Sequence, residues 1–226
     1  LALESCSPLF RMPSRPPSQS ERGVLFDIGG GSTEVAWVRV DQERKSQTLI
    51  GTTSMPVGVI TLQEMFGEGH GSSYEEMVSH VQSHLVGFEN VHRIRREVAQ
   101  GNACLLGTSG TVTTLAGVAL ALPRYNRAAI DGLTLPGQIM RSAIDTPRSF
   151  SRDILAMHPC VAQDRVKHVL PGSAFLEPTH RTCPTGVVTI AHRWVPDGIQ
   201  LCPPPHNGNS CTTEICIVLL LVTLAA

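Results

Sequence analysis

Short apolar runs and one long amphipathic stretch alternate along the chain and predict a mixed α/β domain. Residues 24–28 and 35–40 are largely apolar runs that predict strands, and residues 48–53, which are rich in threonine, suggest a third strand after a polar turn. Residues 74–89 place apolar side chains at helical spacing. Ser72-x-x-Glu75 and Ser73-x-x-Glu76 are candidate capping boxes at the start of that helix.

The second half of the chain continues the alternation. Residues 104–106 predict a buried strand, and 112–122 predict an alanine-rich helix that Pro123 stops. Further helical patterns occur at 136–145, 151–157 and 164–180, and residues 186–191 predict a last strand. This order of elements indicates an α/β fold with a mixed sheet flanked by helices.

The two ends of the chain lack such patterns. Residues 1–22 are rich in proline, serine and charge, which predicts a disordered leader. Residues 201–226 predict an irregular, degenerate tail, because periodicity is lost after 200 and the final apolar run is too short for a membrane span of about 20 residues. The ordered domain is expected at 23–200. Because the chain starts with Leu1, we expect a fragment of a longer protein or a truncated product.

Composition narrows the range of partners and compartments. The formal net charge of −1 provides no basic field that would hold nucleic acid. The seven cysteines form no CxxC pair, which argues against a zinc ribbon or a thioredoxin motif. Scattered thiols in a chain without a signal peptide predict a cytoplasmic protein.

The first candidate site is a glycine-rich loop after the first strand, Asp27-Ile28-Gly29-Gly30-Gly31-Ser32-Thr33-Glu34. Glycines let several backbone N–H groups approach one phosphate, and Ser32 and Thr33 add hydroxyl donors. Asp27 could hold a hydrated Mg²⁺, and a hairpin could bring Glu34 to the same side. A plain hairpin with a glycine turn is the alternative. The flanking acids and the hydroxyls favour a phosphate site, although neither the Walker nor the Rossmann motif is present.

The second candidate site is Gly107-Thr108-Ser109-Gly110-Thr111, between the strand at 104–106 and the helix at 112–122. Free N–H groups and the helix dipole make a helix N-terminus attractive to anions. A glycine-assisted turn with Ser or Thr as N-cap is the alternative. Because each of the two loops follows a buried strand, a shared polyphosphate cleft accounts best for both.

These segments resemble a known family. VLFDIGGGSTEV is similar to the phosphate-loop motif of the Ppx/GppA phosphatases, members of the actin/Hsp70/sugar-kinase superfamily, and GTSGTVTTLAGVAL resembles their second loop and its helix. SMPVGVITLQEMF and PGSAFLEPTHRTCPTGVVTIAHRWVPDG are similar to later family segments. The resemblance covers about residues 23–200 and implies the C-terminal, ribonuclease-H-like lobe of an actin/Hsp70-like fold.

The resemblance also implies a reaction and a site. Family members use Mg²⁺ to hydrolyse terminal phosphates of inorganic polyphosphate or of guanosine pentaphosphate. By this resemblance Asp27 and Glu34 help to hold the metal or to orient the attacking water, and we take Asp27 as the metal ligand and Glu34 as the catalytic residue. The implied phosphate ligands are Gly29, Gly30, Gly31, Ser32, Thr33, Ser109, Gly110 and Thr111. Phosphoryl transfer to water consists mostly of positioning and charge neutralisation, which suits these residue types.

The chain departs from the family pattern in several places. It contains neither a D-x-G-S-N-S-like loop nor an S-G-x-E-E-A-like stretch, whose glutamate is taken as the general base. We therefore expect weak or no activity alone, unless a partner chain or a homodimer completes the site. Lys167 replaces a usual acid, His192 and Trp194 replace Asp and Gly of "ADRG", and Pro178 interrupts a helical pattern.

Two other functions stay open. A sugar- or acid-kinase-like relative would bind ATP, with the GTSGTVTT loop near the nucleoside, and a non-catalytic remnant would bind phosphate without turnover. Four histidines in the second half of the chain lack metal-like spacing and are expected at the surface or at helix ends: His158, His168, His180 and His192.

Overall fold

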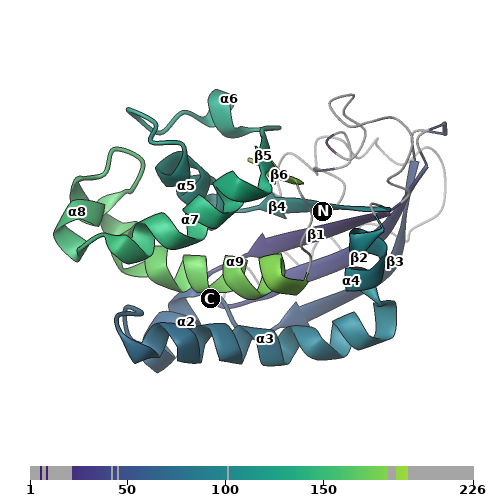
Figure 1. Ribbon diagram of the computed structural model, residues 1–226, viewed down its shortest axis with the longest axis horizontal. Coiled ribbons are helices and arrows are strands. Elements are labelled where there is room, and N and C mark those ends of the chain that lie inside the picture. Colours follow the sequence, from purple (N-terminus) through teal and green to yellow (C-terminus); the bar gives the residue numbers. More distant parts are fainter. Residues whose placement is uncertain are drawn as a thin grey trace, which may run out of the picture.

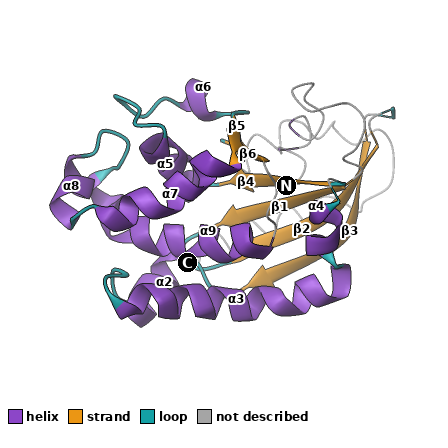
Figure 2. Ribbon diagram, viewed as in Figure 1, coloured by secondary structure: helices purple, strands orange, loops and turns teal. Residues whose placement is uncertain are grey.

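A mixed sheet with helices packed on one face forms the framework of the protein (Figures 1 and 2). The computed structural model describes residues 6, 9, 22–41, 43, 44, 46–100, 102–182 and 187–192. Within these residues the predicted α/β architecture is confirmed. The tail at 201–226 and most of the leader at 1–22 lie outside the described residues.

The sheet has six strands in the order β3-β2-β1-β4-β6-β5. Their bounds are β1 (Arg22–Ile28), β2 (Thr33–Asp41), β3 (Ser46–Met55), β4 (Ala103–Thr108), β5 (Thr134–Pro136) and β6 (Val187–Ala191). The first three strands form an antiparallel meander, whereas β4 runs parallel to β1 and β6 runs parallel to β4. The carboxyl ends of β1, β4 and β6 therefore meet at one edge of the sheet.

The helical layer consists of α2 (Val59–Phe66), α3 (Ser72–His92), α4 (Ile94–Ala99), α5 (Gly110–Ala119), α6 (Arg127–Ile130), α7 (Gly137–Ser149), α8 (Arg152–Met157), the 3-10 helix η2 (Gln163–His168) and α9 (Val169–Thr182). Helix α9 packs against α3 and α7, and Figure 1 shows it running between them. None of the helices in the described part of the chain combines the length and the apolar character of a membrane span.

Alternation along the strands separates two apolar clusters. Val24, Phe26 and Ile28 of β1 join the main core beneath the helices, while Leu25 joins a smaller cluster on the opposite face. The smaller cluster also contains Cys6 and Leu9, which are buried members of the predicted leader. Asp27 has the same parity as Leu25, so the strand directs it away from the main core at the sheet edge.

Several predicted details differ from the structure. The pattern at 164–180 forms two elements, because its first turns are the 3-10 helix η2 and only then does α9 begin. Helix α9 continues through Pro178 to Thr182, so the proline does not end it. The prediction of a capping box at the start of α3 is wrong. Gly71 is the N-cap there, and the Ser73 hydroxyl donates to the carbonyl of His70 over 2.8 Å.

Candidate active site

A cavity of about 750 Å³ lies at the sheet edge where β1 and β4 end. Both predicted loops contribute to its wall, the first through Gly29 and Gly30 and the second through Ser109, Gly110 and Thr111. Asp27 lines the cavity between them. The crevice beyond the carboxyl ends of the strands is the usual ligand site of open α/β sheets. The two loops that the sequence predicted to share a cleft therefore do so.

Helix α2 holds the first glycine loop in place. The carbonyls of Gly29 and Gly30 accept hydrogen bonds from the N–H groups of Val59 and Ile60, over 3.0 and 2.9 Å. A Cβ on Gly58 would overlap the carbonyl oxygen of Gly30, so only glycine permits this approach. With the loop carbonyls bound to the helix, the N–H groups at residues 30–32 have no acceptor among the described residues and remain available to an anion.

The hydroxyls of the first loop brace the loop and do not line the cavity. Thr33 is buried, and its hydroxyl donates to the carbonyl of Val57 over 2.8 Å. The Ser32 hydroxyl donates to Glu34 over 2.7 Å. Among the predicted residues, those at 31–34 lie beside the cavity and not in its wall. The prediction that these two hydroxyls face the phosphate therefore differs from the observed arrangement.

Asp27 and Glu34 are neighbours across the β1–β2 pair, as the hairpin hypothesis predicted. The Asp27 carboxylate makes no hydrogen bond with a described residue, while Glu34 accepts from Ser32 and, over 3.1 Å, from Ser54. Burial, and secondarily the charge of Glu34, raises the pKa of Asp27 to about 6. A cation bound between these two paired carboxylates would stabilise the charged form of both.

The donor set at this point suits Mg²⁺. This ion prefers hard oxygen ligands and is commonly held by one or two carboxylates together with water and phosphate oxygens. Asp27 offers an unbonded carboxylate at the cavity wall, and Glu34 stands beside it. Within the described residues no group of three or more His, Cys, Asp or Glu side chains could hold a metal alone. A bound ion would take its remaining ligands from water and phosphate oxygens.

The second loop forms the N-cap of α5, the alternative to an anion site that the sequence left open. The Ser109 side chain accepts hydrogen bonds from the N–H groups of Thr111 and Val112, over 3.2 and 3.4 Å. Ser109 has a φ of 117°, a conformation that a non-glycine residue rarely adopts. Strain of this kind occurs often where a loop holds a ligand. Because the oxygen accepts both bonds, the hydroxyl proton remains free to donate to an anion.

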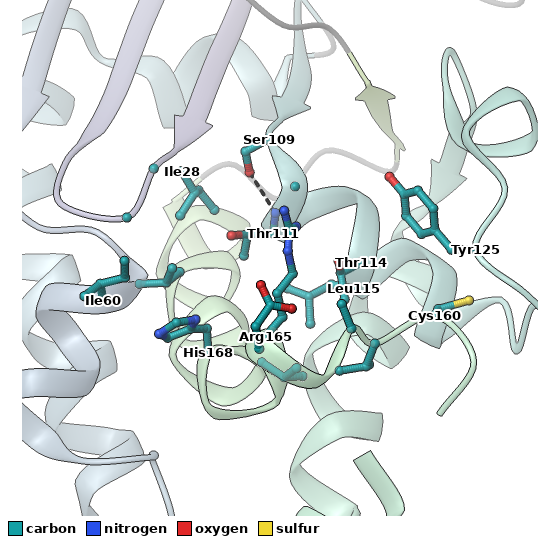
Figure 3. Close-up of a pocket in the computed structure, with 18 of the residues that line it drawn as sticks. Ile28, Ile60, Ser109, Thr111, Thr114, Leu115, Tyr125, Cys160, Arg165 and His168 are labelled. Carbon is teal, nitrogen blue, oxygen red and sulfur yellow. Dashed lines mark hydrogen bonds between the residues drawn. The ribbon is translucent and has the colours of Figure 1, made fainter. Parts of the chain in front are cut away.

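Arg165 is a site residue that sequence reasoning missed. It lies on η2, and a Cβ on Gly110 would overlap its guanidinium, so the cation sits directly at the N-terminus of α5 (Figure 3). The Arg165 side chain has no hydrogen bond or ion pair with any described residue, although Asp164 also lines the cavity. A guanidinium beside a helix N-terminus concentrates positive potential where the two loops converge.

The far end of the cavity is apolar and aromatic. Leu115, Cys160 and Val161 line it together with Tyr125, whose hydroxyl donates to Thr113 over 3.0 Å. The rings of Tyr125 and His192 lie 6.0 Å apart between centroids. The cavity therefore joins a cationic, N–H-rich end to an end that suits a planar, less polar group.

The four histidines considered in the sequence analysis differ in whether they line the cavity. His168 and His192 line the cavity, although the sequence favoured a surface or helix-end position for them. His158 and His180 do not line it. His168 does occupy a helix end, the last residue of η2, but that end opens into the site.

A sequence model of the Ppx/GppA phosphatase family matches residues 15–201. The chain belongs to the Ppx/GppA phosphatase family. The resemblance drawn from the two glycine loops is thereby confirmed. No protein in a search of curated sequences matches the chain.

Solved structures related to Ppx/GppA phosphatases share the fold. The type II variant of the Aquifex aeolicus Ppx/GppA phosphatase superposes with a TM-score of 0.65 at 16% identity, over 87% of this chain and 60% of that one. An exopolyphosphatase-like protein gives 0.69 at 20% identity, over 88% of this chain and 65% of that one. An exopolyphosphatase from Cytophaga hutchinsonii gives 0.64 at 17% identity, over 87% and 62%. The chain thus spans less than two thirds of each of these three relatives.

Proposed function

We propose that this chain releases the terminal phosphate of inorganic polyphosphate or guanosine pentaphosphate by Mg²⁺-assisted attack of water. One observation carries the proposal: two glycine loops converge on one cavity beside Asp27 with the guanidinium of Arg165, which has no partner among the described residues. The N–H groups of the first loop, the N-terminus of α5 and Arg165 all favour an anion with several oxygens. Membership of a phosphatase family supports the same reaction class.

The residues would divide the work of the reaction. Asp27 would hold Mg²⁺, which supplies charge neutralisation at the phosphoryl oxygens. Glu34, oriented by Ser32 and Ser54, would position the water and accept its proton as the new P–O bond forms. Arg165 and the loop N–H groups would stabilise the charge that passes to the bridging oxygen when its bond to phosphorus breaks.

The apolar end of the cavity supports guanosine pentaphosphate over inorganic polyphosphate. Tyr125 and Leu115 would contact a nucleobase, whereas a bare phosphate chain would gain nothing from those walls. We expect turnover by this chain to be slow, because its sequence lacks the S-G-x-E-E-A-like stretch and Glu34, which lies beside the cavity and not in its wall, would have to act as the base instead.

Oxygen-18 water tests the reaction class. Hydrolysis at the terminal phosphorus predicts one oxygen-18 atom in each released phosphate, in the presence of Mg²⁺. If neither substrate yields phosphate that contains oxygen-18, the proposal is contradicted.

A kinase-like relative that binds ATP is the second candidate. The same aromatic end of the cavity favours it, because Tyr125 could contact adenine as readily as guanine. ATP-dependent phosphorylation of an added sugar or carboxylic acid, with no oxygen-18 in free phosphate, would establish the kinase instead.

A further inference from the structure

His168 and Arg165 lie on the same face of η2, and both side chains line the cavity (Figure 3). A 3-10 helix has three residues per turn, so side chains at positions i and i+3 stand above one another. Arg165 reaches the N-terminus of α5 at Gly110. One turn of η2 therefore places the imidazole on the same side of the helix as the guanidinium that faces the proposed phosphate position.

One nitrogen of this imidazole is without a partner. Nε2 is shielded from solvent and forms no hydrogen bond within the described part of the chain. A second ring proton would leave a shielded N–H unsatisfied and would add a positive charge close to Arg165 and Lys167. Burial first, and then Lys167, lower the pKa of His168, with Asp164 acting in the opposite direction and Arg165 in the same one. The empty site thus favours the neutral ring.

A bound polyphosphate reverses this preference. A rotation of the ring toward the cavity would bring its N–H groups within reach of the phosphate oxygens, and the negative charge of the ligand would offset Arg165 and Lys167. The charges that act on His168 lie on its own helix, while α2 presents the apolar Ile60 to the cavity. The other titratable cavity groups are Asp27, Tyr125, Cys160 and His192.

We propose that His168 is a phosphate ligand of this site and takes up a proton when a polyphosphate chain binds, so that affinity rises as pH falls. This inference rests on the proposed function and extends it to a residue outside both glycine loops. Arg165 supplies a permanent charge. His168 adds a charge only when the anion is present.

Isothermal titration of the full chain with sodium tripolyphosphate tests the proposal. Measurement at pH 6 and pH 8, in two buffers of different ionisation heat, gives both the affinity and the number of protons taken up. The comparison variant is His168→Asn, which keeps a side-chain donor but cannot titrate. Tripolyphosphate and Asp27 also titrate, but they contribute alike to every variant, so the difference between variants isolates His168.

We expect the wild type at pH 6 to take up more protons than His168→Asn, with a difference approaching one, and to bind about tenfold more tightly. The two proteins should differ less at pH 8. His80→Asn is the matched control, because burial also lowers the pKa of His80 but that residue lies on α3 outside the cavity. The control should match the wild type at both pH values.

Three results would overturn the inference. Equal proton uptake and equal affinity of wild type and His168→Asn at pH 6 would overturn it and leave the proposed function intact. Failure of the wild type to bind tripolyphosphate at any pH would overturn both. If His168→Asn does not fold, NMR of the wild-type imidazole replaces it. There the pKa of His168 must rise on addition of tripolyphosphate, and an unchanged value would exclude the role.

Discussion

Asp27 and Glu34 occupy opposite positions in the β1–β2 register, so their carboxylates stand on the same face of the sheet. Within the described part of the chain, neither carboxylate forms an ion pair with a basic side chain. Repulsion between them and the burial of Asp27 store unfavourable free energy that a bound cation would relieve. Binding of a cation by this pair should therefore stabilise the folded protein.

Replacement of Asp27 by Asn should stabilise the protein above pH 6. The folded pKa of Asp27 is about 6 against an ordinary value of 3.8, so the folded state holds a proton that the unfolded state has released between these values. Wild-type stability should thus fall as pH rises through this window, by about 3 kcal/mol in all. The gain of Asp27→Asn should appear at pH 8 and vanish near pH 4. Urea unfolding at both pH values measures it, and an equal effect at both would contradict the assigned burial.

Replacement of Gly110 by Ala should weaken phosphate binding without destabilising the fold. The new methyl group would displace the guanidinium of Arg165, while the backbone at Gly110 requires no left-handed conformation. Loss of one charge-assisted contact predicts roughly ten- to hundredfold weaker tripolyphosphate binding. Gly87→Ala is the control, since nothing surrounds that position in α3, and it should raise stability by up to about 1 kcal/mol with binding unchanged. Unaltered binding by Gly110→Ala would remove Arg165 from the site.

Replacement of Gly58 by Ala should damage both stability and binding. Its Cβ would meet the carbonyl oxygens of Gly30 and Gly29, the latter at 2.6 Å, and backbone atoms cannot swing aside as a side chain does. Overpacking of this kind costs about 1–3 kcal/mol, and it would push the first loop away from α2. Gly31→Ala has open space around it and should change stability by less than about 0.5 kcal/mol. Thermal unfolding of both variants checks this contrast, and similar behaviour would contradict it.

Replacement of Glu177 by Gln should destabilise the helical layer. Glu177 is 3% exposed and pairs with Arg148 and Arg181, which ties α9 to α7. Both arginines are partly exposed and can return to water, so we expect a loss of roughly 1–2 kcal/mol. Urea unfolding measures the loss, and the exposed Glu76→Gln on α3 is the control. A loss no larger than that of the control would show that the buried pairs contribute little.

The glycine loops and the sheet could be predicted because their signals are local. A buried strand, three glycines and flanking acids stand together at 24–34, a short apolar run marks β1, and partial alternation of buried and exposed positions marks β2. The capping prediction failed because Gly69 and Gly71 adopt positive φ and turn the chain before α3 begins. Helix α2 has only eight residues, too few for a periodic pattern to distinguish it from a loop.

Arg165 and His168 could not be predicted as site residues from local pattern. They lie far along the chain from both glycine loops, in a segment whose spacing suggested one continuous helix. Only the packing of η2 against α2 and α9 brings them to the carboxyl end of the sheet. The available signal was a basic residue followed three positions later by a histidine, directly before an apolar helix.

Phosphate release from guanosine pentaphosphate and inorganic polyphosphate, with and without Mg²⁺, tests the central claim most directly. Wild type, Glu34→Gln and Asp27→Asn would be compared in the same assay, with circular dichroism to confirm that each is folded. We expect slow release by the wild type that requires Mg²⁺ and is lost in both variants. Release that continues at the wild-type rate in Asp27→Asn and Glu34→Gln, or no release by folded wild type from either substrate, would contradict hydrolysis at this site.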